Sequence, residues 1–183
     1  MRKRHLIRLP GFTLVEILVV VVILGIAGAI IVPQLGTRDD RTSEAAARVM
    51  MADLIYAQNL AITQQSNLYV MFQLTPTPSQ YSLVRSSDMT VVSHPVNRIP
   101  YTVVFGTGGS SGMHGITLVS ADFKGQSATT YLTFGFDEIG TPVVYTGAGS
   151  QALTSGSIVI QAGQFKLRID IEPFTGQITV TAI

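Results

Sequence analysis

The sequence predicts an α+β protein in which one long N-terminal helix is followed by a domain of antiparallel strands. Two helical observations support this: an unbroken apolar run over residues 12–32, and a helical repeat of apolar residues over 42–65. From Leu68 onward, apolar and polar residues alternate with a period of two and turn residues become frequent, which is typical of antiparallel sheet. A chain of 183 residues is expected to hold one globular domain with an added segment.

The first element, the apolar segment Phe12–Val32, could be a secretory signal peptide, a membrane anchor or a buried core helix. As a helix it would be about 31 Å long, which matches a hydrocarbon core of about 30 Å. A core helix of this length would be hard to bury in a small domain. Small residues suited to a signal-peptidase site, Ala27 and Ala29, are followed directly by more apolar residues. We therefore expect a membrane anchor that is retained.

Charge is distributed unevenly around this segment. Four of the 12 Lys and Arg residues, and none of the 11 Asp and Glu residues, precede Phe12. Such a basic leader favours a cytoplasmic N-terminus and export of the remainder of the chain. That remainder is mildly acidic and its positive side chains are scattered. It therefore shows no basic patch of the kind that binds nucleic acid.

One carboxylate, Glu16, lies inside the apolar segment. A carboxylate at membrane depth costs about 2.5–3.5 kcal/mol on insertion scales, so such a group usually faces a partner rather than lipid. The pattern therefore predicts a binding partner for Glu16. The alternative is a side chain that reaches the lipid headgroups and has no further role.

The basic leader ends in Gly11, the residues Phe12-Thr13-Leu14-Val15-Glu16 come next, and Pro33 closes the hydrophobic run. This ordered pattern resembles the class III signal of type IV pilins and type II secretion pseudopilins. The resemblance implies that a prepilin peptidase cleaves between Gly11 and Phe12, that the new amine of Phe12 is methylated, and that the anchor is retained. It also implies that Glu16 meets the Phe12 amine of a neighbouring subunit during filament assembly, which would offset the cost of two buried charges.

Pro33 removes one backbone donor and is expected to bend the helix there. The segment Gly25–Pro33 could loosen when subunits pack into a filament, as the resemblance suggests. Its small residues could equally serve ordinary packing between transmembrane helices.

The second half of the helix is predicted over Thr42–Gln65, and the chain is expected to leave the helix at Asn67. Two adjoining apolar stripes indicate an amphipathic helix packed on a sheet. Asp53 falls between them, and we interpret it as a carboxylate bonded to nearby loop amides rather than as a catalytic residue. The members of the two stripes are Met50, Leu54, Ala57 and Ala61, then Val49, Tyr56 and Leu60.

The strands are expected to be short and separated by turns, and two glycine-rich stretches, Gly106–Gly115 and Thr146–Gly156, are expected to be flexible links. The last two strands read as a hairpin around Pro173–Gly176. The predicted strands are Leu68–Leu74, Gln80–Arg85, Tyr101–Phe105, Ile116–Val119, Tyr131–Phe136, Pro142–Tyr145, Ser157–Gln161, Phe165–Glu172 and Gln177–Ala182.

Two later stretches, "DLIYAQNLAITQQSNLYVMF" and "FKLRIDIEPFTGQITV", are similar to minor pseudopilins of the H type. The first leads an alanine-rich helix straight into a strand, and the second is a terminal hairpin with Thr175-Gly176 in its turn. The middle of the chain, roughly residues 75–130, has no recognisable signature.

The sequence lacks the usual signs of catalysis or metal binding. It has no Cys, and its three His residues include no pair at i and i+4, which argues against a zinc hydrolase. It also lacks the G-x-S-x-G pattern of serine hydrolases. We expect no enzyme activity, no cofactor and no metal; turn or solvent roles are expected for Asp137, Glu138, Asp170 and Glu172.

The resemblance implies a pilin-like α+β protein that serves as a minor pseudopilin of a type II secretion system, helping to begin or cap a short periplasmic filament. The expected regions are a cleaved leader (1–11), a transmembrane and filament-core helix (12–33), an amphipathic helix half (34–67) and a periplasmic β-rich domain (68–183). Expected partners are a prepilin peptidase, other major and minor pseudopilins, the inner-membrane assembly platform and lipid. The alternatives are a minor pilin of a type IV pilus or DNA-uptake system, and a membrane-tethered enzyme.

Overall fold

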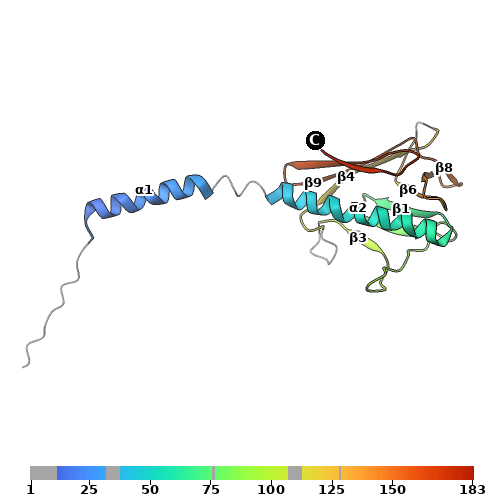
Figure 1. Cartoon of the computed structure of the whole chain (residues 1–183), viewed down its shortest axis with the longest axis horizontal. Helices are drawn as coiled ribbons and strands as arrows, with labels where there is room; N and C mark the ends of the chain where they lie inside the picture. Colours follow the sequence, from blue (N-terminus) through green and yellow to red (C-terminus); the bar gives the residue numbers. More distant parts are fainter. Residues whose placement is uncertain (1–11, 32–37, 76, 107–112, 128) are drawn as a thin grey trace, which may run out of the picture. The chain divides into compact units, whose positions relative to one another are not determined.

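The structure is a computed structural model that describes residues 12–31, 38–75, 77–106, 113–127 and 129–183. Its contacts divide the chain into two compact units, Met1–Arg38 and Asp39–Ile183. Together their elements give the expected α+β composition, with helices first and antiparallel strands after them (Figure 1).

The described part of the first unit is dominated by helix α1, Leu14–Ile31. This helix is shorter than the predicted apolar helix, which runs from Phe12 to Pro33. The predicted bend at Pro33 and the predicted join to the second half of the helix lie outside the described residues. Within the described ranges, neither helix is both long enough and apolar enough to cross a membrane.

Helix α2, Arg38–Gln64, starts earlier than predicted, and all of it except Arg38 belongs to the second unit. Its end has a defined cap: Gln65 takes a left-handed conformation with φ of 47°. The N–H of Ser66 then donates to the carbonyl of Ala61 over 3.2 Å, which is the bond that closes a Schellman motif. The helix therefore stops at its own C-cap rather than at Asn67, where the exit was predicted.

After this helix, the described residues contain eleven strands, which form two antiparallel sheets. The first sheet has the order β3-β2-β1-β6-β7-β8 and the second β11-β10-β9-β4-β5. The strands of the first sheet are β1 (Leu68–Gln73), β2 (Gln80–Arg85), β3 (Thr102–Val104), β6 (Thr133–Phe136), β7 (Pro142–Tyr145) and β8 (Ser150–Ala152). Those of the second sheet are β4 (Thr117–Lys124), β5 (Thr130–Tyr131), β9 (Ser155–Ala162), β10 (Phe165–Ile171) and β11 (Ile178–Ala182).

One predicted strand and one predicted flexible link are wrong. The single strand expected over Tyr131–Phe136 is two strands, because the chain leaves one sheet at Tyr131 and enters the other at Thr133. The stretch expected to be a flexible link over Thr146–Gly156 contains β8, which pairs with β7 as an edge strand.

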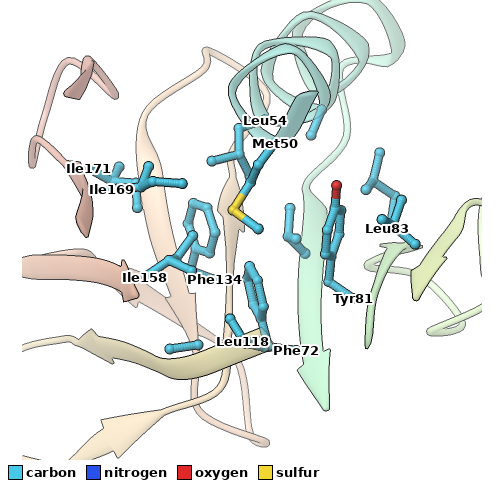
Figure 2. Close-up of a cluster of buried hydrophobic side chains, with 14 of the residues drawn as sticks. Met50, Leu54, Phe72, Tyr81, Leu83, Leu118, Phe134, Ile158, Ile169 and Ile171 are labelled. Atoms are coloured by element: carbon cyan, nitrogen blue, oxygen red, sulfur yellow. The ribbon is translucent and has the colours of Figure 1, made fainter. Parts of the chain in front are cut away.

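Helix α2 provides one side of the hydrophobic core, as its periodicity predicted. Met50, Leu54, Ala57 and Ala61 are all buried, and the adjoining stripe is partly buried against the same cluster. Figure 2 shows Met50 and Leu54 directed toward Phe134 and Ile158, so that one helix face covers residues from both sheets.

The two sheets meet through aromatic rings. The rings of Phe72 in β1 and Phe123 in β4 have centroids 5.5 Å apart, and those of Phe123 and Phe134 in β6 lie 4.3 Å apart. All three side chains are buried. Aromatic pairs in this range add about 0.5–1.5 kcal/mol beyond the area they bury, so they join the sheets as well as filling the core.

Candidate functional site at the start of the first helix

Helix α1 begins with a side-chain cap. The hydroxyl oxygen of Thr13 accepts the backbone N–H of Glu16 over 3.2 Å, and the carbonyl of Thr13 accepts the N–H groups of Glu16 and Ile17 at 3.1 and 3.2 Å. Thr13 is thus the N-cap residue, which satisfies donors that the first turn leaves without intrahelical partners. The spacing of a Thr and a Glu three residues later is the sequence sign of this cap, and the sequence prediction missed it.

Phe12 and Glu16 lie on either side of this cap. Phe12 precedes the helix with 78% of its surface exposed, and Glu16 is an exposed carboxylate in the first turn. A carboxylate there interacts favourably with the positive end of the helix dipole. Within the described residues, no ion pair is formed by Glu16. Gly11 and Pro33, the other predicted site residues, lie outside the described residues.

The large apolar side chains of α1 have no core of their own. From Leu14 to Leu24 each is exposed, and Ile26 is 60% exposed. Contiguous apolar surface of this extent marks a site of interaction with another protein or with a membrane. The start of α1 therefore combines a capped helix end, an exposed aromatic residue, an exposed carboxylate and exposed apolar side chains.

A second polar cluster surrounds Asp53 of α2. Its carboxylate accepts the hydroxyl of Tyr101 over 2.8 Å and also that of Tyr81, which is fully buried. The ring of His94 packs on that of Tyr101 with centroids 4.6 Å apart, and its Nδ1 accepts the N–H of Val96. The expectation that loop amides bond Asp53 was wrong: Tyr81 of β2 and Tyr101, directly before β3, donate to it, because the helix packs on the sheet at this point.

Burial raises pKa values in this cluster. Burial raises the pKa of Asp53, although the tyrosine hydroxyls and His94 partly offset this. Burial also raises the pKa of Tyr81 well above its usual 10.0, and the neighbouring Asp53 raises it further. Both tyrosine hydroxyls donate to Asp53, so the cluster ties β2 and the residue before β3 to helix α2. Among the described residues, no three His, Asp or Glu side chains converge as a metal site would require.

We expect the Tyr81→Phe variant to lose less folding stability than the wild type as the pH rises into the alkaline range. A tyrosine whose folded pKa is raised contributes stability below pH 10.0, and that contribution is lost as pH rises toward the folded pKa. Urea unfolding at about pH 9 and about pH 11 measures the difference. The wild type should lose more stability than Tyr81→Phe between these values, even though the variant starts lower by about 1.5–3 kcal/mol for the missing hydrogen bond. Equal losses would contradict the assigned shift.

The start of α1 lies within a segment that is similar to a known protein family. Residues 10–32 match the family model of the prokaryotic N-terminal methylation motif. The match covers Phe12, Thr13 and Glu16 and the whole of α1, so it falls on the capped helix end and the exposed apolar side chains that come after it. Neither the curated proteins nor the solved structures gave a match to the chain.

Proposed function

We propose that this chain is a minor pseudopilin: a structural subunit of a type II secretion system that helps to begin or cap a short periplasmic filament. The observation that carries the proposal is the N-terminal methylation motif over residues 10–32, which supports a type IV pilin-like subunit of a pilus or pseudopilus. The α+β architecture, with N-terminal helices and antiparallel sheets, is a pilin-like layout. The narrower assignment to secretion rests on the resemblance of the helix-to-strand stretch and the terminal hairpin to H-type pseudopilins.

In this proposal, a prepilin peptidase cleaves between Gly11 and Phe12 and the Phe12 amine is methylated. The apolar segment then anchors the subunit in the bacterial inner membrane, and the second unit lies in the periplasm. The exposed apolar side chains of α1 support this, because lipid before assembly and neighbouring helices after it would remove them from water. The chain would act without a cofactor, and other pseudopilins and the inner-membrane platform would be its partners.

Glu16 has a defined part in the proposal. Cleavage gives Phe12 a cationic amine, and Glu16 lies four residues later in a turn capped by Thr13. A carboxylate and an amine from two subunits would offset each other's desolvation cost where apolar helices bundle, and their contact would set the axial register. The exposure of the Glu16 side chain in the first turn of α1 makes its carboxylate accessible to such a partner.

The cleavage is tested by intact-mass spectrometry after co-expression with a prepilin peptidase. We expect the wild type to lose residues 1–11 and the Gly11→Val variant to stay intact, because glycine lets the backbone lie close in a peptidase site without a side chain. Cleavage beyond Ala29 would reject the proposed class of protein.

The pairing role is tested by comparing three variants for processing, membrane insertion and incorporation into filaments. Glu16→Val and Glu16→Gln should be processed and inserted but should not be incorporated, since each removes the negative charge. Thr13→Val is the matched control, because it removes the helix cap but keeps the carboxylate. Normal incorporation of Glu16→Val would reject the pairing, and equal loss in Thr13→Val would assign the effect to the helix cap.

A further inference from the structure

Among the edge strands of the described residues, β11 differs from the others in length and charge. The two sheets have four edge strands: β3 and β8 with three residues each, β5 with two, and β11 with five. Natural proteins avoid unwanted pairing by keeping edge strands short or by placing charges or prolines on them. Three edges obey this rule by being short. Strand β11 (Ile178–Ala182, ITVTA) is longer and contains neither a charged residue nor a proline.

The side chains of β11 are also exposed to solvent. Thr179, Val180, Thr181 and Ala182 are all exposed. Beside the strand, a groove of about 360 Å³ lies between β11 and the first half of α2. Its lining is mostly apolar and consists of Ala47, Met51, Ile178 and Val180, with Glu44 and Arg48 also lining it.

The hydrogen-bond pattern shows which backbone groups point outward. The N–H of Ile183 donates to the carbonyl of Lys166, and the N–H of Glu172 donates to the carbonyl of Gln177. Bonded and non-bonded pairs alternate along an antiparallel ladder, so Thr179 and Thr181 bond to β10. The N–H and carbonyl groups of the even-numbered residues Ile178, Val180 and Ala182 therefore point away from β10, toward the open edge.

We propose that the β11 edge is an interaction surface for a second copy of this chain, joined antiparallel through β11 itself. An antiparallel pair centred on Val180 places Val180 opposite its own copy and Ile178 opposite Ala182 of the copy. Every outward-pointing residue of one strand then meets an outward-pointing residue of the other, so the backbone donors and acceptors of both edges are satisfied.

The side chains match in the same register. Ile178, Val180 and Ala182 share the face that lines the groove, so the copy continues this apolar face. On the opposite face Thr179 lies across from Thr181 of the copy, and threonine pairs across strands are favourable. Since neither strand carries a charge, no like charges are brought together. The self-pairing is thus complementary on both faces and along the backbone.

The contact is small for a stable dimer, because a stable protein–protein interface usually buries about 1,200–2,000 Å². A single strand pair gives a weak association that anchoring of both copies in one membrane, as the proposed function implies, would strengthen by raising the local concentration. Covalent trapping is therefore the right measurement, and a chain without native cysteine suits it.

The test uses the full chain in detergent with single-cysteine variants Thr179→Cys and Thr181→Cys under mild oxidation. Opposite residues in a non-hydrogen-bonded pair have Cα atoms about 4.5 Å apart, which is within the range of a disulfide. We expect a disulfide-linked dimer when the two variants are mixed. Each variant alone should give none, because its own copy lies two positions away, about 7–8 Å across the diagonal. Ser127→Cys is the control for random collision, because Ser127 is exposed between β4 and β5, at the opposite edge of the same sheet.

A second experiment replaces Val180 by proline. The Val180 N–H points to the open edge, so Val180→Pro should leave the β10–β11 ladder intact and abolish the mixed cross-link. Thermal melting checks that the variant is folded. A mixed cross-link that persists in folded Val180→Pro would overturn the proposal. So would cysteines that react freely with a maleimide without cross-linking, or cysteines that fail to react because another segment or partner covers the edge.

Discussion

Leu54→Asp is expected to destabilise the second unit by at least about 4 kcal/mol. Leu54 is fully buried in α2, and loss of its burial alone costs about 1.5–3 kcal/mol. The new carboxylate would lie among apolar side chains from both sheets without a partner, which adds the penalty for burying a charge (Figure 2). A domain with a total stability of about 5–15 kcal/mol loses much of its margin, and the melting temperature should fall by about 8–16 °C.

The matched control is Ile55→Asp at the next position of the same helix. Ile55 is 47% exposed, so a carboxylate there stays hydrated and the cost should be within about 1 kcal/mol. Circular dichroism and thermal melting of both variants measure the difference. Equal melting temperatures would show that the buried face of α2 is wrongly assigned.

The same measurement can be made on a chain that starts at Asp39, where the contacts divide the molecule. The buried apolar residues of the described chain begin at Ala46, and all of them belong to the second unit. We expect a cooperative transition without α1. A gradual transition would show that the second unit depends on the first.

The face of α2 could be predicted because helical periodicity is a local property. Residues spaced by three and four positions must share a side whatever they pack against, and Met50 and Leu54 are buried as that spacing required. Long alternating strands were predicted for the same reason. The hairpin of β10 and β11 was found with nearly its observed bounds, because a turn containing Gly176 separates two strands of clear alternation.

The features that could not be predicted depend on distant parts of the chain. The break at Leu132 is invisible locally, because the residues on both sides have strand propensity and only the presence of two sheets separates them. Strand β8 exists because β7 offers it an edge. The partners of Asp53 come from positions 28 and 48 residues further on, so no local pattern could identify them. The cap at Thr13, by contrast, has a local sign and could have been predicted.

Gly135 lies against a strand that is distant in the sequence. We expect Gly135→Ala to lower the free energy of unfolding by about 3 kcal/mol. Gly135 lies in β6, directly opposite Tyr69 of β1, where the two strands form the middle of the six-stranded sheet. A Cβ atom at this position would lie 2.0 Å from the carbonyl oxygen of Leu68 and 2.7 Å from the Cα of Tyr69. Both are backbone atoms of a paired strand, so no flexible side chain can move aside.

The added methyl group must therefore displace β1 or β6 from the ladder. Extra atoms in a packed region cost about 1–3 kcal/mol, and the upper end applies because β1 is held by partners on both sides. Gly149→Ala is the control: a Cβ there meets no atom within 4 Å, so its effect should stay within about 0.5 kcal/mol. Thermal melting should place Gly135→Ala about 6–12 °C below the wild type and Gly149→Ala close to it. If the two variants melt together, β1 and β6 do not approach each other as closely as the described pairing requires.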